Sequence, residues 1–207
     1  TLDYDVLIAI VSSNDISQLI RIIENGKVDG IILTRTIMKD LPAEYLKSKG
    51  IPFVTIGTPT DKDVIQIDND HRSACKELTS ILLMKGMKRI GLIGGSETHI
   101  VNSSRYKGYE DAHMEYKIPL NKELIYLNVE NSVMTERVME DLLENKVDCI
   151  TCMDDTICTF VLNKLRKENI KVPEEMKVAS FYNSILLENN IPTITSLKFD
   201  PKELGMV

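Results

Sequence analysis

The chain has 207 residues, of which 43% are hydrophobic and 27% are charged, and its net charge at pH 7 is −6. This length can bury a sizeable core, as one domain or as two small ones, and the composition is typical of a soluble globular protein. No Lys/Arg cluster is denser than residues 85–89, and no apolar run approaches the roughly 20 residues of a membrane span, which argues against a nucleic-acid surface and against a membrane protein.

Apolar and amphipathic runs alternate in the first part of the chain. The continuous apolar run 6–11 predicts a buried strand, and the apolar face within residues 16–23 predicts a helix. Residues 28–33 and 53–56 predict two further strands, and a short helix is expected to begin near Pro42, since proline suits the first helical turn.

The same alternation continues to the end of the chain. Asp70 is the predicted cap of a helix over residues 71–84, and Ser103 or Ser104 is expected to begin a helix that has Arg105 in its first turn. The other expected elements are strands at 90–93, 124–127, 150–153 and 178–181, and helices at 132–143 and 156–167. Such strand–helix alternation predicts an α/β fold with parallel sheets covered by helices on both faces.

One segment of the sequence occurs nearly twice. Residues 24–33, ENGKVDGIIL, return as residues 144–152, ENKVDCITC, and each copy ends a helical pattern, turns and enters a buried strand. The repeat indicates two similar lobes, between which a small-molecule cleft is expected. The alternative is chance, because helix–turn–strand junctions use few residue types.

The four cysteines and three histidines do not form a metal or redox motif. Cys149 and Cys152 have the C-x-x-C spacing but lie in a predicted strand, where positions i and i+3 point to opposite faces. Buried reduced thiols are therefore expected, which favours a cytoplasmic protein. The glycine-rich residues 91–95 lack the spacing of dinucleotide and phosphate loops, so no cofactor and no metal are expected.

Ligands of open parallel sheets bind beyond the carboxyl ends of the strands, so the polar residues that follow each strand are the candidates. Arg105 stands out because its guanidinium can form two hydrogen bonds with a carboxylate or with vicinal hydroxyls; the alternative is a surface arginine paired with Glu110 or Asp111. Of Asp154 and Asp155, one is expected to cap the following helix and the other to accept from ligand hydroxyls. No nucleophile–base pair is supported.

Five segments, in the same order, resemble the effector-binding core of LacI/GalR-type transcriptional regulators, which share the fold of periplasmic sugar-binding proteins. They are VDGII at 28–32, LMKGMKRIGLIGG at 83–95, RYKGY at 105–109, VPEEMKV at 172–178, and IPTITSL at 191–197 followed by Leu204 and Gly205. The resemblance implies two doubly wound lobes, truncated at both ends. The N-terminal lobe would span residues 1–86 and the C-terminal lobe residues 87–194, and residues 195–207 would return to the first lobe.

The resemblance also implies a site between the lobes, a homodimer, and operator DNA bound only through a headpiece outside this chain. The effector would be a sugar, a modified sugar or a nucleoside-like molecule. The implied effector contacts are Arg105, Asp154, Tyr182, His99, Val101, Thr156, Gly57 and Thr58. The implied hinge residues are Asp68 and Asn69.

The sequence departs from the family pattern at several positions. Asp154 stands where an asparagine is usual and Tyr182 where an aspartate is usual, which argues against a simple hexose. The small A-x-G pattern of the next helix is replaced at residues 156–160, so lobe packing there is expected to differ. The family's first strand and helix, its last strands and its headpiece are not found in this sequence, and the region near Asn14 looks a few residues short.

The sequence is therefore interpreted as the sensory core of a transcriptional regulator and not as an enzyme. The first alternative is a sugar-binding protein for transport or chemotaxis with the same fold. The second is an enzyme on a doubly wound fold, which no nucleophile, metal set or dinucleotide loop supports.

Overall fold

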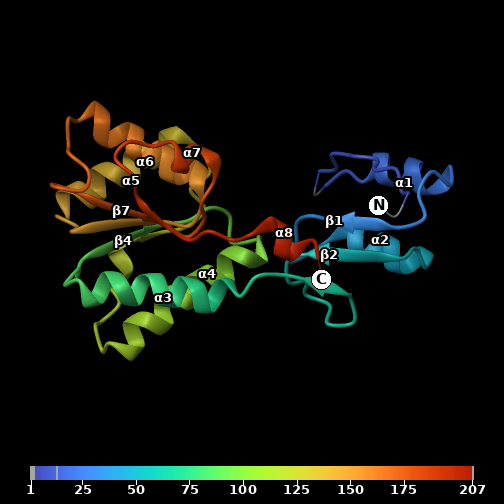
Figure 1. Cartoon of the computed structure of the whole chain (residues 1–207), viewed down its shortest axis with the longest axis horizontal. Coiled ribbons are helices and arrows are strands. Elements are labelled where there is room, and N and C mark those ends of the chain that lie inside the picture. The colour runs from blue at the N-terminus through green and yellow to red at the C-terminus, as the bar shows by residue number, and fades with distance from the viewer. Residues whose placement is uncertain (1–2, 13, 207) are drawn as a thin grey trace. The chain divides into compact units, whose positions relative to one another are not determined.

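The computed structural model describes residues 3–12 and 14–206, and the chain forms two compact units, Thr1–Asp68 and Asn69–Val207 (Figure 1). Both units contain parallel strands that alternate with helices, so the α/β prediction is confirmed. Within the described ranges, no helix is long and apolar enough to cross a membrane.

The first unit contains a three-stranded parallel sheet in the order β1-β2-β3. Asp40 begins one of its helices by accepting a hydrogen bond from the amide of Ala43 at 3.2 Å, and Gly50 ends it in the left-handed conformation. The elements of this unit are α1 (Ser17–Glu24), β1 (Ile31–Leu33), α2 (Leu41–Lys49), β2 (Phe53–Ile56) and β3 (Gln66–Ile67).

The strand predicted at residues 6–11 is wrong. This segment joins no sheet, and most of its apolar side chains are exposed, with Val6 at 85%. An apolar run forms a buried strand only where a neighbouring strand takes up its backbone hydrogen bonds, and β1 pairs with β2 alone.

The second unit contains a five-stranded parallel sheet in the order β5-β4-β6-β7-β8. Its helices before β6 are α3 (His71–Met84) and α4 (Ile100–Glu115), then a short 3-10 helix (Lys122–Leu124) and α5 (Ser132–Glu144). Its later helices are α6 (Asp155–Lys167), α7 (Ile185–Glu188) and α8 (Pro201–Leu204). Its strands are β4 (Ile90–Ile93), β5 (Ile125–Tyr126), β6 (Cys149–Cys152), β7 (Lys177–Ser180) and β8 (Thr195–Ser196).

The two faces of the second sheet support separate cores. Cys152 packs among residues of α5 and α6, such as Leu142 and Val161, whereas Cys149 packs among residues of α3 and α4, such as Leu78 and Tyr109. All four cysteines are free and buried. The expectation of reduced thiols on opposite faces of one strand is therefore confirmed.

The boundary between the units differs from the one expected at residue 86. Helix α3 packs along α4 in the second unit, where Arg72 donates two hydrogen bonds to Asp111, at 2.6 and 3.0 Å. β8 pairs with β7, so residues 195–196 extend the second sheet, and residues 195–207 group with the second unit and not with the first. Helix α3 and β8 belong to the second unit because of the elements that they pack against or pair with. The sequence pattern does not reveal these long-range partners.

One helix begins earlier than predicted. His99 is the residue before α4, in an extended conformation, and Ser103 and Ser104 lie inside the helix and do not cap it. Arg105 consequently lies in the second turn of α4 and not in the first.

Candidate functional site at the strand ends of the second unit

The carboxyl ends of β4, β5, β6 and β7 lie at one edge of the second sheet because the strands are parallel. The segments that follow these strands carry most of the expected site residues. Several of their polar side chains, among them Asn102, Asn128 and Asp154, are held by local hydrogen bonds, as in a preformed ligand site.

Arg105 reaches this edge from α4, and only 7% of it is exposed. Its guanidinium carbon lies 5.8 Å from the centre of the Tyr182 ring, within the range of a cation–π interaction. Asp111 is bonded to Arg72, and Glu110 lies near the hydroxyl of Tyr106, whose pKa is raised by burial and by that carboxylate. Arg105 is therefore a buried residue beside an aromatic ring and not an exposed surface residue, and its role as an effector contact stays a prediction.

Asp154 caps α6, because its Oδ1 accepts a hydrogen bond from the amide of Ile157 at 2.8 Å. Burial raises the pKa of this carboxyl above its usual value; the amide bond and the positive charge of Arg105 oppose that rise in part. One of Asp154 and Asp155 was expected to cap the helix, and the structure shows that this residue is Asp154. The other carboxylate oxygen of Asp154 lies near Gly95. Asp155 lies in the first helical turn.

Tyr182 follows β7 and is partly exposed. Its backbone is fixed by Ser180, whose hydroxyl donates to the Tyr182 carbonyl at 2.7 Å. The ring lies beside Arg105, so one side of the phenol contacts the cation. The exposed part of the ring remains available to a planar ligand.

Two asparagines at this edge were missed by sequence reasoning. Asn128 and Glu97 are joined twice: the amide of Glu97 donates to Asn128 Oδ1 at 3.0 Å, and Asn128 Nδ2 donates to Glu97 Oε2 at 2.7 Å. The buried Asn102 donates to the carbonyl of Ser96 at 2.9 Å. Both asparagines stabilise the loop after β4. Asn128 directly follows a predicted strand, so the rule used for the other candidates would have found it.

The remaining candidates of the second unit lie near the same edge. His99 and Val101 are at the start of α4 and are partly exposed, and Thr156 is an exposed residue in the first turn of α6. Nothing in the structure assigns them a ligand, and their role as effector contacts stays a prediction.

The candidates of the first unit follow β2. Gly57 has a φ of +110°, which an L side chain rarely adopts, and an added Cβ would lie 3.0 Å from the hydroxyl of Thr36. Thr58 donates from both its amide and its hydroxyl to Asp68 Oδ2, each at 2.8 Å. Asp68 therefore stabilises this loop, and Asp68 and Asn69 lie at the junction of the two units. Hinge motion there stays a prediction.

The arrangement provides chemistry for binding. A buried guanidinium, an aromatic ring and a partly buried carboxylate lie close together at one sheet edge. Among residues 3–12 and 14–206, no group of three or more His, Cys, Asp or Glu side chains is placed to hold a metal ion.

A family model described as periplasmic binding proteins and the sugar-binding domain of the LacI family matches residues 1–201. Catabolite control protein A of Staphylococcus xylosus is 26% identical over 200 residues, which are 95% of this chain and 61% of that protein. The HTH-type transcriptional regulator RegA of Clostridium saccharobutylicum is 27% identical over 216 residues, 99% of this chain and 64% of that protein.

Solved structures give the same result. The crystal structure of a putative LacI transcriptional regulator from Bacillus cereus subsp. cytotoxis superposes with a TM-score of 0.83 at 29% identity, covering 90% of this chain and 68% of that one. The chain belongs to the family of periplasmic binding proteins and LacI-type sugar-binding domains. It spans less than two thirds of the length of these two curated relatives, the second of which is named as a transcriptional regulator.

Proposed function

We propose that this chain is the effector-binding and dimerisation core of a cytoplasmic LacI-type transcriptional regulator. A small molecule binds at the strand ends, and a headpiece outside this chain reads operator DNA. The family match and the named relatives support a regulator over a transport protein or an enzyme. The observation that carries the proposal is the buried Arg105 beside Tyr182 and Asp154 at one sheet edge.

The effector we propose is a modified sugar, a glycoside or a nucleoside-like molecule. Tyr182 offers one hydroxyl and a flat ring where the family usually has a carboxylate, which suits stacking on a ligand ring. Arg105 can donate several hydrogen bonds to hydroxyls or to an acidic group. Contacts from Gly57, Thr58, His99, Val101 and Thr156 belong to the same proposal and rest on the family resemblance.

A thermal-shift screen tests the effector class. Neutral hexoses, ribose, sugar acids, amino sugars, glycosides and nucleosides are added separately to the chain. We expect stabilisation by members of the last four groups. Strong stabilisation by glucose, galactose or ribose alone would contradict the proposed class.

The role of Arg105 is tested by calorimetry with whichever compound stabilises the chain most. Arg105→Ala removes a charge-assisted hydrogen bond, so we expect affinity to fall by roughly 10- to 150-fold, which corresponds to about 1.5–3 kcal/mol. Lys122→Ala, at an exposed residue of the short 3-10 helix, is the matched control and should bind like the wild type. If Arg105→Ala changes the affinity by less than about threefold, Arg105 is not an effector contact.

The homodimer also forms part of the proposal, and α7 provides a surface that fits it. Ile185 is 71% exposed, Leu186 is 59% exposed and Ile191, just after α7, is 87% exposed. Arg166 of α6 lies beside them and is bonded to Asn190. Apolar side chains grouped on a surface with polar neighbours are typical of an interface between proteins.

A further inference from the structure

The second unit has a cavity that does not involve the strand-end residues Arg105, Asp154 and Tyr182. Its volume is about 550 Å³, which lies in the range of small-molecule sites. Its lining comes from the first turn of α3, the second half of α4 and the turn that follows α4. The lining residues are Arg72, Lys107, Glu110, Asp111, His113, Met114, Lys117, Ile118, Pro119 and Leu120.

One wall of this cavity is a turn held in place by hydrogen bonds. Lys117 donates its amide to the carbonyl of Met114 at 3.1 Å, and Ile118 donates its amide to the carbonyl of His113 at 3.0 Å. The ring Nδ1 of His113 lies 3.3 Å from the Ile118 carbonyl, and Ile118 and Leu120 pack against the core. Burial lowers the pKa of His113, so the ring is neutral at pH 7 and Nδ1 donates to that carbonyl. The wall is therefore preformed.

The lining of the cavity is mostly apolar, the cavity is open to solvent, and its rim carries charge. Met114, Ile118, Pro119 and Leu120 supply the apolar surface, and Met114 is 75% exposed. When a ligand covers exposed apolar surface of this kind, the free energy of the system falls, which favours binding.

The charged residues of the rim favour a ligand that carries a negative charge. Arg72 and Asp111 bond to each other and compensate one another, and burial and the nearby Glu110 raise the pKa of Tyr106. Across the described residues, no ion pair joins Lys107 or Lys117 to a carboxylate, although Lys107 is among the cations that lower the pKa of Asp111 after its hydrogen bond with Arg72. The lining thus has three basic and two acidic side chains, Arg72, Lys107 and Lys117 against Glu110 and Asp111.

We propose that this cavity is a second ligand site, which binds a small amphipathic anion: an apolar ring that carries one carboxylate. The ring covers Met114 and Ile118, and the carboxylate lies between Lys107 and Lys117. The site is separate from the proposed effector site, because Lys107 and Arg105 are two residues apart on α4 and project about 200° apart around the helix.

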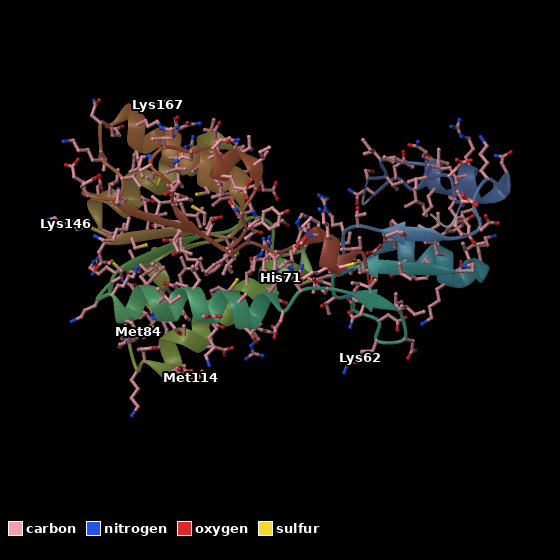
Figure 2. The ribbon with its side chains drawn as sticks, viewed as in Figure 1. Lys62, His71, Met84, Met114, Lys146 and Lys167 are labelled. Carbon is pink, nitrogen blue, oxygen red and sulfur yellow. The ribbon has the colours of Figure 1, made fainter. Side chains whose placement is uncertain are left out.

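Fluorine NMR titration of the chain with para-trifluoromethylbenzoate tests the proposal. We expect saturable binding that Met114→Glu and Lys107→Glu each weaken by about tenfold, equivalent to about 1.4 kcal/mol. Met84→Glu is the matched control, because Met84 is an exposed methionine of α3 that lies outside the cavity (Figure 2). The neutral analogue para-trifluoromethylbenzyl alcohol should bind more weakly than the carboxylate.

Each variant is first checked for an unchanged thermal unfolding temperature and circular dichroism spectrum; Lys107→Gln replaces Lys107→Glu if the latter is not folded. The proposal is overturned if the wild type shows no saturable binding, or if Met84→Glu weakens binding as much as Met114→Glu. It is also overturned if Arg105→Ala abolishes binding, since the probe would then occupy the effector site. Retained binding by Arg105→Ala supports it.

Discussion

At the scale of single residues, the carboxyl group of Asp154 has two properties: it caps α6, and its burial disfavours the ionised form. Its pKa is raised from the usual 3.8 because the group is buried. The protonated form is favoured in the folded state, so this group contributes most stability below pH 3.8. That contribution is lost as the pH rises through the folded pKa. At neutral pH the ionised carboxylate is therefore a cost to the fold.

Two substitutions at Asp154 separate the cap from the charge. Asp154→Asn retains the acceptor for the Ile157 amide without the charge, so we expect a higher free energy of unfolding than the wild type at pH 7 and a smaller difference at pH 3. Asp154→Ala removes the cap and should cost about 0.5–2 kcal/mol at pH 7, relative to Asp154→Asn. Urea unfolding at both pH values measures this. A less stable Asp154→Asn at pH 7 would contradict the prediction.

At the scale of elements, the close packing of α3 and α4 depends on Gly108. A Cβ added there would lie 2.3 Å from the carbonyl oxygen of Arg72 and 2.9 Å from the Cβ of Cys75, closer than real contacts allow. These atoms belong to the helix backbone and a buried side chain, so neither can move aside cheaply. The contact between the two helices is the largest between any two elements of the second unit.

Gly108→Ala tests this packing. Alanine in a helix interior normally gains about 0.5–1 kcal/mol over glycine, but the steric overlap with α3 costs about 1–3 kcal/mol, so we expect a net loss of stability. Gly205→Ala is the control, because its nearest contact would be 3.4 Å away and its backbone is not left-handed. Thermal unfolding of both variants is the measurement. An increase in melting temperature for Gly108→Ala would show that α3 can move away.

At the scale of the whole molecule, the prediction concerns self-association. A two-fold dimer places the same surface of each copy in contact, so charges introduced at Ile185 and Ile191 are brought near their own counterparts. We expect sedimentation velocity to show a dimer for the wild-type chain at micromolar concentrations and a monomer for the double variant Ile185→Lys, Ile191→Lys. Met84→Lys, which changes an exposed apolar residue elsewhere, should remain a dimer. A wild-type monomer at every concentration would count against this interface.

The sequence by itself determined the alternation of elements and the edge at which the candidate site residues lie. The helix over residues 71–84 and the strands 53–56 and 90–93 were predicted to the residue, because their caps and apolar runs are local. Residues that follow parallel strands must lie at one edge, which is why Asp154 and Tyr182 could be placed at that edge without a structure, and their role in binding stays a prediction.

Only the tertiary structure decided the points that depend on distant neighbours. The apolar run 6–11 is not a strand, because strand formation needs a partner that sequence pattern cannot supply. The division at residues 68 and 69 follows from the packing of α3 on α4. The contact of Tyr182 with Arg105 and the bonds of Asn128 with Glu97 each join segments from different strands, and only the folded sheet brings these side chains together.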